Sequence, residues 1–368
     1  RLIYMIKKKI LIATGGTGGH IFPAYSLAKF FSKKKYKVEL TTDQRGLKFL
    51  KNDLDLNIIK INSSPLIKKN IFKFMISFFI IIISIINSFF FLLYNRPSII
   101  FGMGGYSSFP ICVAAFLLRI KFVIYENNLI IGKANKFLLP FCKKIFVSYK
   151  ELEGIPENYN DKVIEIGNIV REEIINFNKN SQVFKNFNEI KILVLGGSQA
   201  AKIFAEKLPK IFRNLKESGI PVSVLQQCQK NQNELLLKFY KNTKMDFKIF
   251  NFTDRILDYY AEANLVITRS GASVLGELIN VKTPFICIPL PNSADNHQFK
   301  NAEFYLKKGC GYLLEEKDIE NKLKNLINSL FIEKSLIKNI ISNQRQYSDK
   351  NVFSNLNIQI EKILNEKN

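Results

Sequence analysis

The chain contains 368 residues, of which 47% are hydrophobic, and it carries a formal net charge of +23. This length allows two domains with complete cores, and the hydrophobic content excludes a disordered chain. Five scattered cysteines without a Cys-x-x-Cys pair exclude a zinc motif and a disulfide framework, which fits a reducing cytoplasm. The excess of lysine and arginine indicates attraction to an anionic membrane or a nucleic acid, or only a surface solvated by lysine.

Strand and helix patterns alternate from Lys9 to Gly167, as in parallel α/β units; Met5 is a candidate start residue. Strands are expected at residues 10–13, 38–42, 56–61, 98–101, 122–125, 144–147 and 163–166. A second series is expected at residues 191–195, 222–226, 247–250, 265–268, 284–288 and 311–314. The sequence therefore predicts a first domain over residues 5–168, a linker over 169–188 and a second domain over 189–347. A C-terminal helix over residues 348–368 is expected to return to the first domain.

Four of these strands end in glycine and small polar residues. The turns are Gly15-Gly16-Thr17-Gly18-Gly19-His20, Gly102-Met103-Gly104-Gly105-Tyr106-Ser107-Ser108, Gly196-Gly197-Ser198-Gln199 and Arg269-Ser270-Gly271-Ala272-Ser273. Glycine lets the backbone adopt positive φ and approach a ligand, and a following helix directs free N–H groups at that ligand. Ligands of open α/β sheets bind outside the carboxyl ends of the strands. The pattern predicts a phosphate or sugar diphosphate in a cleft between two sheets, although one such turn alone would be explained equally well as a tight connection.

The segment from Phe74 to Tyr94 contains no charged residue and is long enough to span a membrane. A span is disfavoured because the segment lies between two strands of one expected sheet. Its polar residues and those of its flanks also fall near one helical stripe: Lys69, Asn70, Lys73, Ser77, Ser84, Asn87, Ser88 and Asn95. We expect one or two helices that pack partly on the sheet and lie partly in the membrane interface. The alternative is a wholly buried core helix.

With these turns in order, the sequence resembles the bacterial transferases that add N-acetylglucosamine to undecaprenyl-diphospho-N-acetylmuramoyl-pentapeptide, converting lipid I into lipid II of peptidoglycan. The resemblance covers nearly the whole chain and includes residues 15–23, 102–108, 167–171, 196–199, 269–277 and 295–302. It implies a glycosyltransferase-B fold, in which two Rossmann-like parallel-sheet domains face each other across a cleft. It also implies that the C-terminal domain binds UDP-N-acetylglucosamine and that the N-terminal domain binds the lipid acceptor.

The same resemblance implies a peripheral enzyme at the cytoplasmic face of the bacterial inner membrane. The expected partners are the two substrates, an anionic inner-membrane surface contacted through Phe74–Tyr94, and other proteins of cell-wall synthesis. No cofactor is implied.

The implied reaction is a single inverting displacement, in which the muramoyl 4-hydroxyl attacks the anomeric carbon of the donor. It requires a base for the hydroxyl and neutralisation of charge on the departing UDP. His20 is the candidate base, because a helix start disfavours a protonated imidazole. Its alternative role is to orient a phosphate or cap the turn. Glu126 is the second candidate base, or else a structural carboxylate that caps a turn, and Tyr125 precedes it where the family usually has histidine.

The resemblance also implies the residues that bind substrate. Arg171 and Ser198 are expected to contact the diphosphate, Glu277 the ribose hydroxyls, and the backbone near Thr253 the uracil edge. The sugar and acceptor side is expected to comprise Thr17, Gly18, Gly19, Tyr106 and Asn128. N-acetylglucosamine is assigned to Gln298 and to the loop Ala272, Ser273, Val274, Leu275 and Gly276. His297, the only other histidine, contacts the sugar or caps a helix.

Other functions fit the sequence less well. The first glycine turn lacks the Gly-x-Gly-x-x-Gly register of nicotinamide-dependent oxidoreductases. The lysines are spread along the chain without a nucleic-acid-binding motif, so no nucleic-acid partner is expected. Asp53-Leu54-Asp55 has the spacing of metal-dependent transferases but precedes an expected strand, so no catalytic metal is expected. The remaining alternative is another UDP-sugar-dependent glycolipid transferase of the same fold.

Overall fold

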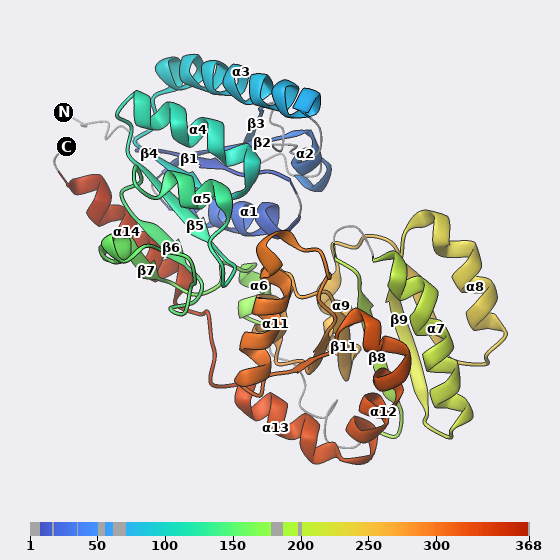
Figure 1. Ribbon diagram of the computed structural model, residues 1–368. Coiled ribbons are helices and arrows are strands. Elements are labelled where there is room, and N and C mark those ends of the chain that lie inside the picture. Colours follow the sequence, from blue (N-terminus) through green and yellow to red (C-terminus); the bar gives the residue numbers. More distant parts are fainter. Residues whose placement is uncertain are drawn as a thin grey trace. The chain divides into compact units, whose positions relative to one another are not determined.

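The computed structural model describes residues 8–16, 18–34, 36–50, 56–61, 71–177, 187–197 and 201–366. The chain divides into two compact units, one made of Arg1–Arg171 with Asp349–Asn368 and the other of Glu172–Ser348. Each unit is built on a parallel sheet covered by helices (Figure 1), so the predicted pair of Rossmann-like domains is confirmed. The predicted linker at 169–188 includes positions 178–186, which lie outside the described residues.

The first unit contains a seven-stranded sheet in the order β3-β2-β1-β4-β5-β6-β7, in which all paired strands are parallel. Its strands are β1 (Lys9–Ala13), β2 (Lys37–Thr42), β3 (Asn57–Lys60), β4 (Ile99–Gly102), β5 (Phe122–Glu126), β6 (Ile145–Val147) and β7 (Val163–Glu165). Each lies within one residue of its predicted bounds. Strands β4 and β5 are buried along their whole length, which explains their uninterrupted apolar sequences.

Helices cover both faces of this sheet (Figure 1). One face carries α1 (Gly18–Ser32), α2 (Gln44–Leu50) and α14 (Val352–Asn365), and the other carries α3 (Ile71–Asn95), α4 (Gly105–Leu117) and α5 (Lys133–Leu138). The helices change faces because the strand order reverses direction between β1 and β4 and the connections are right-handed. That reversal marks the sheet edge at which open α/β sheets bind ligands. A short 3-10 helix, η1 (Glu157–Lys162), precedes β7.

Helix α14 belongs to the first unit and is fastened there by polar contacts at its start. The Asp349 carboxylate accepts the backbone N–H of Asn168 at 2.8 Å. Gly167 has a φ of +94°, and a Cβ there would stand 2.4 Å from the Asp349 Oδ1, so the chain returns at a point that only glycine fits. Phe353 then stacks on Phe30 of α1, with ring centroids 5.0 Å apart.

The second unit contains a six-stranded parallel sheet in the order β10-β9-β8-β11-β12-β13. Its strands are β8 (Ile190–Leu195), β9 (Val222–Gln227), β10 (Phe247–Phe250), β11 (Leu265–Thr268), β12 (Phe285–Cys287) and β13 (Tyr312–Leu313). All of them were predicted, again within one residue. The order again reverses, here between β8 and β11, which places the two glycine-bearing turns of this unit on adjacent strands.

The helices of this unit alternate with its strands, as the pattern predicted. They are α6 (Glu172–Ile175), α7 (Lys202–Glu217), η3 (Lys230–Gln232), α8 (Asn233–Lys241), α9 (Ile256–Glu262), α10 (Ala272–Val281), η4 (Ala294–Asn296), α11 (His297–Lys307), η5 (Glu316–Asp318), α12 (Ile319–Ile332) and α13 (Lys334–Gln344). The core includes Phe204, Phe212 and Tyr240 from α7 and α8, all fully buried. Phe187, inside the predicted linker, is also buried in this core.

Helix α3 turns three serines of the predicted polar stripe inward, whereas Asn87 of the same stripe is exposed. Ser77, Ser84 and Ser88 are at most 2% exposed, and the first two donate to the carbonyls of Phe74 and Ile80 in their own helix. The small serines let α3 pack along α4. The outward side chains are large and apolar, with exposed fractions of 45–88%: Phe72, Met75, Ile76, Phe78, Phe79, Ile83, Ile86, Phe90, Leu93 and Tyr94. The alternative of a wholly buried core helix is therefore wrong.

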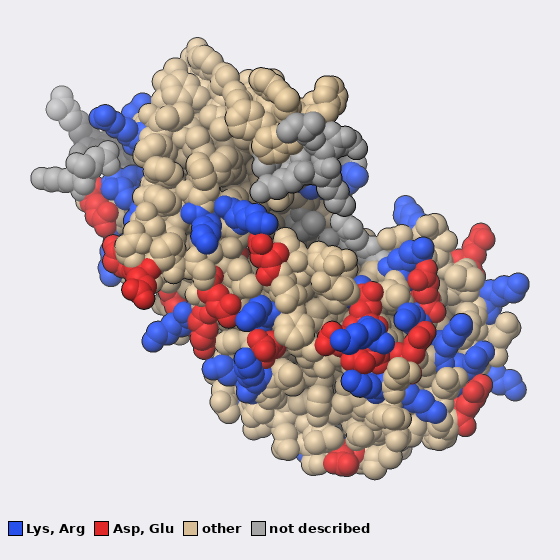
Figure 2. All heavy atoms as spheres, viewed as in Figure 1, with Lys and Arg blue, Asp and Glu red and all other residues tan. Residues whose placement is uncertain are grey.

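The outward surface of α3 is continuous with that of α4. In Figure 2 this region consists almost entirely of uncharged residues. Within the described residues, α3 is the one helix long and apolar enough to cross a membrane, and 22% of its apolar window is buried. Because β3 and β4 at its two ends belong to one sheet, we interpret α3 as lying along a surface rather than crossing a bilayer.

Candidate active site

The first two glycine turns meet at the carboxyl ends of the adjacent strands β1 and β4. His20, in the first turn of α1, lies with its ring against the second glycine turn. A Cβ on Gly104 would stand 3.3 Å from the His20 Cε1, and a Cβ on Gly105 would stand 3.4 Å from the His20 Cδ2. Both glycines have positive φ, 83° and 75°, so the approach of the ring to this turn depends on glycine. The Thr14 hydroxyl donates to the His20 carbonyl at 3.0 Å and fixes the start of the helix.

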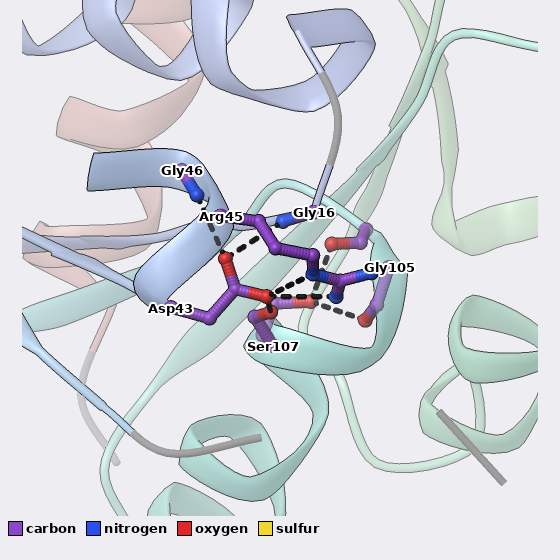
Figure 3. Close-up of polar contacts among 8 residues, drawn as sticks. Gly16, Asp43, Arg45, Gly46, Gly105 and Ser107 are labelled. Carbon is purple, nitrogen blue, oxygen red and sulfur yellow. Dashed lines mark hydrogen bonds and ion pairs between the residues drawn. The ribbon is translucent and has the colours of Figure 1, made fainter. Parts of the chain in front are cut away.

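Asp43, directly after β2, ties the same turns together (Figure 3). Its Oδ1 accepts the N–H groups of Gly16 at 3.1 Å and Gly46 at 2.9 Å. Its Oδ2 accepts the Ser107 hydroxyl at 3.0 Å, and the Nε and Nη2 of Arg45 at 2.9 and 2.7 Å. Burial raises the pKa of the Asp43 carboxyl, but the two backbone N–H groups and the Arg45 guanidinium outweigh it and hold the pKa below its ordinary value.

Glu126 ends β5 at the same edge of the sheet and is 3% exposed. Its Oε1 accepts the backbone N–H and the side-chain amide of Asn128, at 3.1 and 2.9 Å. Its Oε2 accepts the Gly132 N–H at 2.9 Å and the Asn135 amide at 3.0 Å. Both oxygens are engaged in shaping the loop after β5, which favours the turn-capping role that the sequence left open.

That loop is joined to the first glycine turn. The Asn127 side-chain amide donates to the Gly19 carbonyl at 3.3 Å. Gly19 and the buried Gly18 begin α1, so these predicted residues occupy the helix start beside His20. Thr17 lies outside the described residues.

Arg171 and Tyr106 lie at different borders of this group. The Arg171 guanidinium sits 5.8 Å from the ring centroid of Phe22, two residues beyond His20 on α1. Tyr106 occupies the first turn of α4 and is 44% exposed. The first unit therefore brings together His20, the candidate base, Asn128, predicted for the acceptor side, and Arg171, predicted for the diphosphate. Their roles stay predictions.

Tyr125, which stands where the family usually has histidine, is a structural residue here. It is 2% exposed, its hydroxyl lies 2.7 Å from the Ser148 Oγ, and it accepts the Ile169 N–H at 3.0 Å. Burial raises its pKa well above the ordinary value, so the phenol stays neutral. It joins β5 to the segment after β7.

In the second unit, the turn after β8 has the geometry of a close backbone approach. The Gly196 N–H donates to the side chain of Gln227 at 3.1 Å, and Gly197 has a φ of +77°. Among the described residues, no atom lies within 4 Å of a Cβ placed on Gly197. Ser198, Gln199 and Ala200 lie outside the described residues.

The turn after β11 is organised by a buried arginine. Arg269 is 8% exposed; its Nη1 donates to the carbonyls of Ile288 and Pro289 at 3.0 and 3.1 Å, and its Nη2 pairs with Glu316 at 2.6 Å. The next residue, Ser270, is fully buried, and its hydroxyl has no hydrogen-bond partner in the described part of the chain. A buried hydroxyl left in this way at a strand end is suited to a ligand oxygen.

Helix α10 begins directly after this turn and carries six predicted residues. Ala272, Leu275 and Gly276 are buried, whereas Ser273 and Val274 are half-buried. The buried members pack into the unit, so any contact they make with a ligand is through their backbone. Glu277, the next residue of the helix, accepts the Tyr260 hydroxyl at 2.9 Å.

The last predicted residues border neighbouring loops of the same unit. The Thr253 hydroxyl accepts the Arg255 N–H at 3.0 Å, before α9. Gln298, in the first turn of α11, accepts the Leu290 N–H at 3.0 Å and so orders the loop after β12. The His297 Nδ1 lies 2.6 Å from the Ala294 carbonyl, which matches its alternative role at a helix start.

No cluster of three or more His, Cys, Asp or Glu side chains suited to a metal ion occurs within the described residues. Asp53 and Asp55, whose spacing resembles that of metal-dependent transferases, lie outside them. The absence of a catalytic metal stays a prediction.

Two family descriptions match this chain: the glycosyltransferase family 28 N-terminal domain at residues 10–147 and the glycosyltransferase family 28 C-terminal domain at residues 191–356. The chain belongs to glycosyltransferase family 28. The family and the enzyme class predicted from the sequence are thereby confirmed. The two matched domains correspond to the two sheets, each with its own pair of glycine-bearing turns.

Full-length relatives agree with this assignment. The UDP-N-acetylglucosamine--N-acetylmuramyl-(pentapeptide) pyrophosphoryl-undecaprenol N-acetylglucosamine transferase of Pelagibacter ubique is 35% identical over 366 residues, covering 98% of this chain and 100% of its own. The enzyme of the same name from Rickettsia felis is 35% identical and covers 92% and 96%. Among solved structures, Acinetobacter baumannii MurG matches with a TM-score of 0.78 at 23% identity, covering 97% of this chain and 100% of its own, which shows a shared fold.

Sequence reasoning missed three residues that organise these turns: Asp43, Asn127 and Asn135. Asp43 and Asn127 directly follow strand ends, as the glycine turns do, so the strand pattern contained their signal, whereas Asn135 lies on α5. None belongs to a glycine turn, and the partners of each lie in loops separate from its own position, so motif spacing alone did not reveal them.

Proposed function

We propose that this transferase moves N-acetylglucosamine from UDP-N-acetylglucosamine to the 4-hydroxyl of the muramoyl sugar of lipid I, giving lipid II with inversion at the anomeric carbon. The observation that carries the proposal is the end-to-end match to transferases named for this chemistry, which covers 98% of this chain. Glycines with positive φ after strands in both units, such as Gly104 and Gly197, support it. Metal-independent transfer, with no cofactor, remains part of the proposal.

His20 is the proposed base. It lies in the first turn of the 15-residue helix α1, where the helix dipole disfavours the protonated ring and keeps a nitrogen able to accept a proton. Its ring is half-buried against Gly104 and Gly105, whose missing side chains leave room for a sugar to approach. Glu126 suits a positioning role better than proton transfer, because all four of its described hydrogen bonds hold the adjoining loop.

The donor is assigned to the second unit. The turn at Gly197, with a φ of +77°, and the adjoining Ser198 are proposed to receive the diphosphate. Glu277 is proposed for the ribose, the backbone near Thr253 for the uracil, and Gln298 with the start of α10 for the sugar. The buried hydroxyl of Ser270 supports a polar ligand at this edge of the sheet.

Membrane attachment is proposed through α3. Its outward side chains are mostly large and apolar, whereas Ser77, Ser84 and Ser88 are buried. The exposed surface of the helix therefore suits contact with lipid rather than with water. Peripheral attachment at the cytoplasmic face would bring the first unit to a lipid-linked acceptor. The other cell-wall proteins expected as partners stay a prediction.

A basic depression next to α3 supports an anionic membrane surface. It encloses about 390 Å³ and is lined by four cations and one carboxylate among its described residues: Lys8, Arg96, Arg119, Lys121 and Glu366. Arg96 directly follows α3 and Arg119 closely follows α4, so positive charge lies at the ends of the two helices that bear the apolar surface. Acidic headgroups would be attracted there while α3 enters the interface.

The function is tested with purified protein, radiolabelled UDP-N-acetylglucosamine and a lipid I analogue carrying a shortened prenyl chain, with and without EDTA. We expect transfer that survives EDTA, and none to a matched analogue that lacks the muramoyl 4-hydroxyl. Failure of transfer by folded protein that still binds the donor would overturn the acceptor assignment. Failure to bind the donor at all would overturn the functional proposal.

A further inference from the structure

A single buried carboxylate joins three loops at the sheet edge that carries His20. Asp43 follows β2, Gly16 follows β1, and Ser107 follows β4, and these three strands are neighbours in the order β2-β1-β4. Asp43 accepts hydrogen bonds from both Gly16 and Ser107, at 3.1 and 3.0 Å, and so connects the end of β2 to the end of β4 across β1 (Figure 3).

The contacts leave little freedom to this group. The Asp43 side chain is 5% exposed, and its oxygens accept from two backbone N–H groups, one hydroxyl and one guanidinium. A Cβ on Gly15 would stand 2.2 Å from the Ser107 Oγ, so Ser107 is packed directly on the first glycine turn. Any displacement of one turn therefore requires the others to move.

The same carboxylate holds a cation at the turn. Arg45 donates to Asp43 through both Nε and Nη2, which fixes the orientation of the guanidinium plane. Its side chain is nevertheless 50% exposed, and its Nη2 would stand 3.7 Å from a Cβ on Gly16. A half-exposed guanidinium fixed beside a glycine turn is suited to an anionic substrate group.

We propose that Asp43 is a positioning residue of the acceptor site, which locks the two glycine turns in one arrangement and presents Arg45 to the diphosphate of the lipid-linked acceptor. The inference rests on the proposed function and adds the residue that aligns its acceptor side. His20 belongs to the first of these turns and lies against the second. A shift of either turn changes the position of its ring relative to the reacting hydroxyl. Displacements of about 1 Å cost about 100-fold in rate, so the lock acts on kcat rather than only on stability.

The chain offers a matched control on the same strand. Glu39 of β2 is also a buried carboxylate with a 5% exposed side chain, and it pairs with Lys9 at 2.9 Å. It lies within β2 rather than at its carboxyl end, and its polar contacts in the described part of the chain are with Lys9, Asn57 and Asn95, not with either glycine turn. Glu39→Gln therefore removes a comparable buried charge without loosening the acceptor side.

The test compares wild type, Asp43→Asn and Glu39→Gln in the lipid I analogue assay. Calorimetric titration with the donor gives the donor affinity, and its stoichiometry gives the amount of folded protein. We expect kcat per folded molecule to fall about 10- to 100-fold in Asp43→Asn and no more than about twofold in Glu39→Gln, with donor affinity equal in all three. Equal losses in the two variants would reduce Asp43 to a stabilising residue and overturn the positioning role.

Two milder variants keep the inference testable if Asp43→Asn does not fold. Ser107→Ala removes one hydrogen bond to the carboxylate, and we expect kcat to fall about 3- to 10-fold. Arg45→Gln is expected to raise the acceptor KM about 10-fold, with partial rescue by Arg45→Lys and no change in the donor KM. An unchanged kcat in Ser107→Ala overturns the positioning role of Asp43. An unchanged acceptor KM in Arg45→Gln overturns the contact between Arg45 and the acceptor diphosphate. If the wild type itself transfers nothing, the proposed function fails instead.

Discussion

Replacing two outward residues of α3 should weaken membrane binding without weakening the fold. Phe79 and Ile83 are one helical turn apart and each is 55% exposed. The double substitution Phe79→Ser with Ile83→Ser removes apolar surface that faces away from the core. Because neither side chain is buried, the free energy of unfolding should change by no more than about 0.5 kcal/mol per site.

The expected loss of affinity follows from the exposed fractions. Complete burial of a Phe or Ile side chain contributes about 1.5–3 kcal/mol. Inserting 55% of that surface into the interface contributes about 0.8–1.7 kcal/mol for each residue, or about 1.6–3.3 kcal/mol for the pair. At about 1.4 kcal/mol per factor of ten, the vesicle partition coefficient should fall about 15- to 250-fold.

The measurement is co-sedimentation with vesicles of phosphatidylcholine alone and of phosphatidylcholine with phosphatidylglycerol. A matched control carries Leu235→Ser with Ile332→Ser, which removes a similar area of surface, 65% and 66% exposed, from the second unit. We expect the control to bind like wild type. Equal binding by all three proteins, or equal loss in both variants, would refute the assignment of α3 as the membrane contact.

Three further substitutions test the site and its supports. His20→Ala should lower kcat about 100- to 10,000-fold with unchanged donor affinity, and a loss below tenfold in stopped-time transfer assays would contradict its role as base. Gly167→Ala should destabilise the first unit by about 1–3 kcal/mol in urea unfolding, because φ is +94° and the new Cβ would stand 2.4 Å from the Asp349 Oδ1. A change in the free energy of unfolding below about 0.5 kcal/mol would mean that this turn relaxes freely. Arg269→Met should lower the free energy of unfolding of the second unit by about 2–3 kcal/mol. This is less than for a fully buried pair, because the Glu316 side chain is 24% exposed. An unchanged urea midpoint would show that the buried guanidinium does not stabilise this unit.

The strands of both sheets were predictable because most are short, largely apolar runs bounded by turn residues. Parallel strands covered on both faces must be apolar throughout, and this leaves a signal in the local sequence that later packing does not change. The glycine turns were predictable for a related reason. A backbone with positive φ at a strand end, as at Gly104 and Gly105, selects glycine locally.

The side of α3 that faces the protein was not predictable. The sequence showed a polar stripe on an apolar helix, and such a stripe ordinarily faces water. The structure buries Ser77, Ser84 and Ser88 instead, because small side chains let α3 approach α4 closely. Which face is inward depends on the neighbouring helix, and that neighbour lies beyond the local sequence.

The sequence by itself determined the strands, the glycine turns, the family and the residue types of the candidate site. All of these depend on local backbone preference or on motifs contained in short segments. Only the tertiary structure decided that Asp43 joins Gly16 to Ser107, that Glu126 is committed to its own loop, and that Asp349 closes the first unit across 181 residues of chain. These contacts depend on strand order and on which distant loops lie side by side. A residue's type shows that its side chain can form hydrogen bonds, but not which residue will be its partner.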